Sequence, residues 1–136
     1  MNSVVILGAK RTALGALLGQ FTGVPATLLG STAIKAAMQQ ANISGESVDE
    51  VIMGCVLPAG LGQAPARQAA LEAGVDQKAG ATTINKVCGS GMKAVMFAAD
   101  LIKAGSANVV VAGGMESMTN APHLLMGSRT GIRYGN

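Results

Sequence analysis

The chain has 136 residues, a length that suits one domain with its own core. Hydrophobic residues make up 49% of it and charged residues only 12%, against about 25% in typical soluble proteins, so there are too few charges to cover a free-standing surface comfortably. The net charge is +3 without a basic stripe, and aromatic residues are only 2%, which argues against nucleic-acid binding.

The sequence also gives little support for a membrane protein or a metal-binding protein. No apolar run reaches the roughly eighteen residues of a membrane span, and the N-terminus lacks the basic and long apolar regions of a signal peptide. We therefore expect a cytoplasmic protein without a membrane partner. The two cysteines have neither metal-ligand spacing nor a CxxC motif, so we expect no metal site and no disulfide framework.

The first half of the chain predicts two strands with a helix between them. Val4–Leu7 is a continuous apolar run ended by Gly8, which is typical of a strand buried on both faces. Pro25 suits the first turn of a helix, which we expect to end near Asn42. Residues 51–53 predict the second strand.

The second half continues the alternation. A short helix through Arg67 leads to a strand over 82–84, a long apolar helix is expected over 92–103, and a strand follows over 109–112. Strands that alternate with helices favour right-handed crossovers. We therefore predict an α/β layered fold with a mostly parallel or mixed sheet and helices on both faces.

The helix over 92–103 is apolar on more than one side. Met92 and Val95 belong to one apolar face, while Phe97 and Leu101 belong to another, so the helix should be covered nearly all round. A single sheet covers one side of a helix. The sequence therefore predicts a second covering layer, from the same protein or from another chain.

Cys88 stands at the expected strand-to-helix turn. Backbone N–H groups at a helix start favour nearby negative charge, and hence a thiolate, and they could form half of an oxyanion hole. Gly89 and Gly91, on either side of Ser90, would allow a sharp turn and the close approach of an acyl carbonyl. Unpaired cysteines are often buried and inert, but this setting favours a nucleophile. Cys55 lacks such a setting, and we interpret it as a buried thiol at a strand end.

Other charged residues leave their roles open at this point. Arg11, Arg67 and Lys93 could reach a coenzyme phosphate or bind backbone carbonyls and acids within the protein. Glu116, beside Ser117, is weak evidence for acid–base chemistry, because one carboxylate without a proton path does not define a catalyst.

Several motifs in series resemble the N-terminal part of the thiolase family, specifically its acetyl-CoA acetyltransferases. They cover nearly the whole chain and are Arg11-Thr12 with Gly15, Gly62-Gln63-Ala64-Pro65-Ala66-Arg67-Gln68-Ala69, Asn85-Lys86-Val87-Cys88-Gly89-Ser90-Gly91-Met92-Lys93-Ala94 and Ala112-Gly113-Gly114-Met115-Glu116-Ser117-Met118.

The resemblance implies a function and a role for Cys88. In the family, the matching cysteine takes an acyl group from an acyl-CoA as a thioester, and its backbone N–H serves an oxyanion hole. The expected reaction is the reversible Claisen condensation of two acetyl-CoA to acetoacetyl-CoA, or thiolysis of a 3-ketoacyl-CoA. Coenzyme A thioesters are then substrates, no cofactor is bound covalently, and a homodimer or homotetramer is expected.

The resemblance also implies what these 136 residues lack. The catalytic histidine of the family, its second cysteine and most of its coenzyme A contacts belong to the C-terminal part of the subunit. His123 does not match the catalytic histidine motif, and we interpret it as structural. We expect residues 1–116 to form the N-terminal α/β half-domain and residues 117–136 the truncated start of a loop domain, and the isolated chain to be inactive.

Two alternatives remain at this point. One is a ketoacyl synthase of the same superfamily, which also uses a cysteine at a helix start, although the motifs around Cys88 and Glu116 favour a thiolase. The other is a noncatalytic fragment that only associates with other chains.

Overall fold

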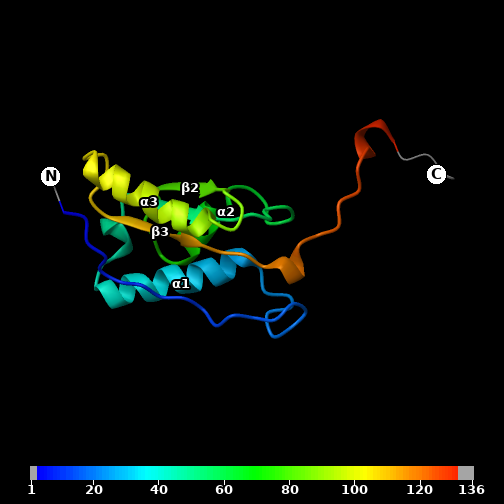
Figure 1. The fold of residues 1–136 in the computed structure, drawn as a ribbon, viewed down its shortest axis with the longest axis horizontal. Coiled ribbons are helices and arrows are strands. Elements are labelled where there is room, and N and C mark those ends of the chain that lie inside the picture. Colours follow the sequence, from blue (N-terminus) through cyan, green and yellow to red (C-terminus); the bar gives the residue numbers. More distant parts are fainter. Residues whose placement is uncertain (1–2, 132–136) are drawn as a thin grey trace.

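The structure is a computed structural model and describes residues 3–131. It contains three α-helices and three strands, joined by loops with short 3-10 turns at 45–47, 118–120 and 128–130 (Figure 1). The helices are α1 (Ala26–Ala41), α2 (Pro65–Glu72) and α3 (Ser90–Lys103), and the strands are β1 (Glu50–Gly54), β2 (Gly80–Ile84) and β3 (Val110–Gly114).

The three strands form one parallel sheet in the order β2-β1-β3. Glu50 at the start of β1 lies opposite Gly80 of β2 and Val110 of β3. The strands predicted over 51–53, 82–84 and 109–112 are therefore confirmed, each within one or two residues. Parallel strands joined by helices place their carboxyl ends at one edge of the sheet, where ligands bind in open α/β folds.

Helices cover both faces of this sheet, as predicted. α1 and α2 pack against each other, and with Val51 and Met53 of β1 their buried side chains form the main core. α3 contacts β1 and β3 from the other side, and Figure 1 shows it across the sheet from α1. Because β1 is central, four of its five residues are buried, which explains its continuous apolar sequence.

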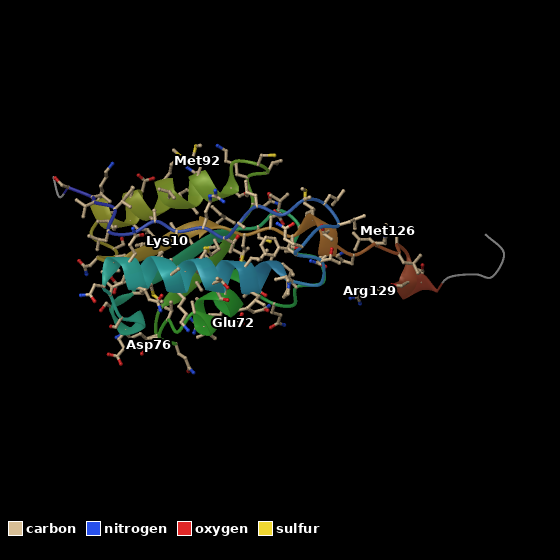
Figure 2. The ribbon with its side chains drawn as sticks, turned by 90° about the horizontal axis from the view of Figure 1, so that it is seen from below. Lys10, Glu72, Asp76, Met92, Met126 and Arg129 are labelled. Carbon is tan, nitrogen blue, oxygen red and sulfur yellow. The ribbon has the colours of Figure 1, made fainter. Side chains whose placement is uncertain are left out.

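α3 is covered on one side only. Its buried residues, Ser90, Ala94 and Ala98, are spaced by one helical turn and face the sheet. On the outer side Met92 is 74% exposed and Met96 51% exposed, and Figure 2 shows Met92 directed away from the body of the protein. The prediction that the sheet alone does not cover this helix is confirmed.

The predicted first strand, Val4–Leu7, is wrong for this structure. The segment forms no strand, and Val5, Ile6 and Leu7 are all more than half exposed. A strand needs a hydrogen-bonding neighbour, but this segment runs beside α1, where the Ala9 N–H donates to Gln40 Oε1 at 2.9 Å (Figure 1). An apolar run can predict a strand, but not whether a partner strand is next to it.

The segment after β3 leaves the body of the protein, as Figure 1 shows. Asn120 fixes its beginning, because its Nδ2 donates to the carbonyl oxygens of Phe21 and Val24. Residues 122–131 are exposed. The predicted boundary between 116 and 117 stays a prediction, and residues 132–136 of the second predicted domain lie outside the described residues. In the part of the chain that the structure describes, no helix is both long and apolar enough to cross a bilayer.

The first turn of α3 lies directly against the ends of β1 and β3. A Cβ placed on Gly54 would come within 2.6 Å of Ser90 Cβ, so the two backbones can approach only because Gly54 has no side chain. A Cβ on Gly114 would lie 3.3 Å from Gly91 Cα, which is tighter than an ordinary contact. This close packing sets where α3 begins.

Gly54→Ala should therefore destabilise the fold by about 1–3 kcal/mol, because the added methyl group overlaps the backbone and side chain of Ser90. Gly113→Ala is the matched control, since a Cβ there would meet only Met53 Sδ at an ordinary 3.6 Å. Urea unfolding of both variants measures the difference. Equal midpoints would contradict the close packing.

Candidate active site

Cys88 lies in the turn between β2 and α3, as predicted. The turn is closed by two backbone hydrogen bonds, from the Gly89 N–H to the Lys86 carbonyl and from the Ser90 N–H to the Val87 carbonyl, both at 3.1 Å. Gly89 is the residue before the helix, and Cys88 is exposed. An exposed thiol at a helix start is accessible to an electrophile and lies near the positive end of the helix dipole.

The sharp turn is made at Val87 rather than at the flanking glycines. Val87 has φ of 49°, in the left-handed region that β-branched residues avoid, whereas Gly89 has φ of −89°. Such a conformation costs roughly 1–3 kcal/mol. The left-handed residue of the turn is therefore Val87 and not Gly89, and the close approach of an acyl group at Gly89 and Gly91 stays a prediction.

Ser90 spans the turn with its side chain. Its hydroxyl, in a residue only 4% exposed, donates to the Val87 carbonyl at 2.6 Å and accepts the Lys86 N–H at 2.7 Å. On the other side of the turn, the Val87 N–H donates to Asn85 Oδ1 at 2.9 Å. Sequence reasoning placed Ser90 in the turn but assigned it no hydrogen bonds.

Cys88 lines a groove of about 1320 Å³. The N-terminal segment, α1, α3 and β3 form its walls, which are mostly apolar, and Arg11 and Glu116 also line it. The sequence did not reveal this groove, because the residues that line it come from distant parts of the chain.

Glu116 joins the ends of β1 and β3. Its carboxylate accepts the backbone N–H groups of Val56 at 2.8 Å and Leu57 at 3.1 Å, and Cys55 Sγ lies 3.7 Å from Oε1. The carboxylate therefore fixes the loop that follows β1, which is a structural role that sequence reasoning missed. An acidic residue two positions after the end of an apolar strand is the sequence signal that could have indicated it.

The predicted burial of Cys55 is confirmed, since the residue is 1% exposed. Burial, with the charge of Glu116 as a second cause, raises the pKa of the Cys55 thiol from 9.0 to about 11. Cys55 therefore remains a neutral thiol at physiological pH, in contrast to the exposed position of Cys88.

The structure gives contacts within the protein for two of the three basic residues whose roles the sequence left open. Arg67 donates to the carbonyl oxygens of Ala79 and Gln77, so its guanidinium holds the loop before β2. Lys93 Nζ lies 4.2 Å from the centroid of the Phe97 ring, one turn further along α3.

His123 and the possible metal-binding side chains remain to be placed. His123 is in an exposed coil segment. Among residues 3–131, no group of three or more His, Cys, Asp or Glu side chains could hold a metal ion.

Comparisons with known proteins agree on one family. Residues 4–136 match the family model described as "Thiolase, N-terminal domain". The chain is 57% identical over its full length to an acetyl-CoA acetyltransferase of Cupriavidus necator and 56% identical over 99% of its length to acetyl-CoA acetyltransferase 2 of Arabidopsis thaliana. It covers 35% and 34% of these proteins, so it spans about a third of the length of the curated relatives it matches.

A solved structure agrees with the sequence matches. The crystal structure of Acat5 thiolase from Ascaris suum in complex with coenzyme A superposes on 96% of this chain with a TM-score of 0.89 and 38% sequence identity. The chain covers 34% of that structure. These matches favour the thiolase interpretation over the ketoacyl synthase alternative.

The two thiols should differ in reactivity. We expect iodoacetamide at pH 8 to modify Cys88 much faster than Cys55, because Cys88 is exposed, whereas Cys55 is buried and, with a pKa of about 11, is about one part in a thousand ionised. Peptide mapping by mass spectrometry at successive times gives both rates. Equal labelling of the two thiols in folded protein would contradict the assignment.

Cys55 should also make stability depend on pH in the alkaline range. The pKa of the Cys55 thiol is about 11 in the folded state and 9.0 in the unfolded reference. Below pH 9.0 the thiol is protonated in both states, and its contribution to the free energy of unfolding is fully present. As pH rises toward about 11, the unfolded state loses its proton first, and this contribution is lost. Cys55→Ser keeps a donor toward Glu116 but does not titrate there. Urea midpoints should fall more steeply across this interval in the unmodified protein than in Cys55→Ser. Parallel curves would show that the thiol does not contribute.

Proposed function

The chain belongs to the thiolase family, and from this membership we propose that the full-length protein is an acetyl-CoA acetyltransferase in which Cys88 is the nucleophile. The observation that carries the proposal is the exposed thiol of Cys88 at the turn between β2 and α3, where it lines a groove of about 1320 Å³. The substrates are coenzyme A thioesters, which fits the coenzyme A bound in the Ascaris suum thiolase structure.

The first chemical step is acyl transfer to sulfur. Cys88 loses its proton, and its Sγ attacks the carbonyl carbon of acetyl-CoA to form a C–S bond and a tetrahedral oxyanion. The C–S bond to coenzyme A then breaks, and coenzyme A leaves with a proton as the free thiol. The Cys88 backbone N–H, beside the N-terminus of α3, is proposed to donate to the oxyanion. The turn residues Gly89, Ser90 and Gly91 hold this geometry.

The second step transfers the acetyl group to carbon. The α-carbon of a second acetyl-CoA loses a proton and attacks the thioester carbonyl, so that a C–C bond forms and the C–S bond to Cys88 breaks. In the net balance the α-proton is taken up by the released Cys88 thiolate, which gives acetoacetyl-CoA and the free thiol. In the reverse direction, coenzyme A cleaves a 3-ketoacyl-CoA. His123 has no part in this proposal, because it lies in an exposed coil segment and does not resemble the catalytic histidine motif of the family.

A homo-oligomer in the cytoplasm remains part of the proposal. The outer edge of β2 pairs with no other strand within residues 3–131, so its backbone groups are open to a neighbouring chain. The uncovered side of α3 also offers Met92 and Met96 to a further layer.

Acetylation of Cys88 tests the proposal directly. After incubation of the full-length protein with acetyl-CoA, intact-mass analysis should show one acetyl adduct, and peptide mapping should place it on Cys88. Cys88→Ala should abolish the adduct, because no thiol remains in the turn. Cys55→Ser, which changes the buried thiol only, should retain it.

The proposal fails if the adduct persists in Cys88→Ala, or if unmodified full-length protein acquires none. An adduct on Cys55 alone would move the nucleophile to the other thiol and would contradict the assignment made from exposure.

A further inference from the structure

We propose that Ser90 is a positioning residue for Cys88: its buried hydroxyl holds Val87 in the left-handed conformation and thereby fixes the direction in which the thiol meets the acyl substrate. This role rests on the proposed function of Cys88 as the nucleophile. Ser90 belongs to the lining of the groove, but it is only 4% exposed, and its hydroxyl is engaged with the backbone of the turn.

Val87 needs an external constraint to keep its conformation. Its φ of 49° is unfavourable for a β-branched residue, and such conformations persist only where the surroundings hold them. Packing within residues 3–131 does not supply this constraint, because Val87 is 65% exposed there. The constraint must therefore act on the backbone of the residue.

Side chains bind both polar backbone groups of Val87. The Ser90 hydroxyl donates to its carbonyl at 2.6 Å, and Asn85 Oδ1 accepts its N–H at 2.9 Å. The Ser90 hydroxyl also accepts the Lys86 N–H at 2.7 Å, so a single oxygen binds two consecutive residues of the turn. A hydroxyl can make both bonds at once, since it has one donor and two acceptor sites.

Ser90 is itself held by the sheet. Its Cβ lies where a side chain on Gly54 would be, so it packs against the end of the central strand β1. Asn85 is anchored more weakly and is exposed, with its Nδ2 at 3.4 Å from the Val56 carbonyl. Of the two side chains that bind Val87, Ser90 is therefore the one that transmits the position of the rigid sheet to the turn.

Loss of the hydroxyl removes the 2.6 Å bond to the Val87 carbonyl and the 2.7 Å bond from the Lys86 N–H, and leaves the Ser90 backbone N–H on that carbonyl at 3.1 Å. With one of the two bonds to this carbonyl gone, the turn should relax. Val87 would then move toward negative φ, and rotation about its backbone would carry the next residue, Cys88, with it. A displacement of about 1 Å at a reacting atom can cost about a hundredfold in rate. The expected defect is in the acylation rate rather than in substrate binding.

Ser90→Ala in the full-length protein tests this role, because it removes the hydroxyl and keeps the Cβ that packs on Gly54. We expect kcat for acetyl transfer to fall by about tenfold to a hundredfold with little change in KM. Ser106→Ala, an exposed serine beyond the end of α3, is the matched control and should leave both constants unchanged.

A second substitution separates positioning from a general folding defect. Val87→Gly in the Ser90→Ala background should restore most of kcat, because glycine adopts positive φ without the steric cost that valine has. Because glycine also relieves the roughly 1–3 kcal/mol cost of a left-handed valine, urea midpoints are measured beside kcat. A Ser90→Ala protein that is fully folded under assay conditions yet slow has its defect in the turn and not in global stability. If Ser90→Ala alone fails to fold, the variant with both Ser90→Ala and Val87→Gly is measured instead. Acetylation of Cys88 near the rate of the unmodified protein supports the positioning role. Slow acetylation, or failure of this double variant to fold, overturns it.

The remaining outcomes are distinct. Acetylation of Cys88 in unmodified protein with kcat of Ser90→Ala within about twofold overturns the positioning role and leaves the proposed function intact. A fall in kcat that Val87→Gly does not restore also overturns the role. Absence of acetylation in unmodified full-length protein overturns the proposed function and this role together.

Discussion

The contact between the first turn of α3 and the sheet ends is the constraint on which the candidate site depends. It requires glycine at the strand ends, because Gly54 leaves the space that Ser90 fills and a Cβ on Gly114 would come within 3.3 Å of Gly91 Cα. A helix placed this close to the carboxyl ends of parallel strands has its N-terminal N–H groups at the edge where open α/β sheets bind ligands. The position of Cys88 therefore depends on the lack of side chains at the glycines of this contact. A larger residue at these glycine positions would push α3 away from the sheet and move the turn that carries Cys88.

Glu116 fixes the same end of the sheet through hydrogen bonds. Its carboxylate binds two consecutive backbone N–H groups after β1, and hydrogen bonds to a charged acceptor are stronger than those between neutral groups. The same carboxylate helps to keep Cys55 protonated. One edge of the sheet therefore holds two thiols in opposite environments. Cys88 is exposed beside the start of a helix, and Cys55 is buried beside a negative charge, so only the first suits nucleophilic chemistry.

Local patterns predicted most of the fold and the place of Cys88 at the strand-to-helix turn. The three observed strands and the helix after Pro25 follow from apolar runs and from proline, which act within a few residues. The strand expected at Val4–Leu7 failed because pairing depends on a neighbour that periodicity does not report. The left-handed Val87 was also missed, since sequence rules assign such turns to glycine, and hydrogen bonds from Ser90 and Asn85 override that preference. Contacts of this kind depend on the assembled structure.

The strand order β2-β1-β3 has a consequence for synthesis of the protein. β1 is central, yet both of its neighbours follow it in the chain, and Val110, which lies opposite Glu50 in β3, is made sixty residues later. At translation rates of about 5–20 residues per second, β1 waits roughly 3–12 s for this second neighbour. During that time the edge of β1 that later pairs with β3 has no hydrogen-bonding partner. The strand that waits unpaired is therefore the one whose carboxyl end later packs against the turn that carries Cys88.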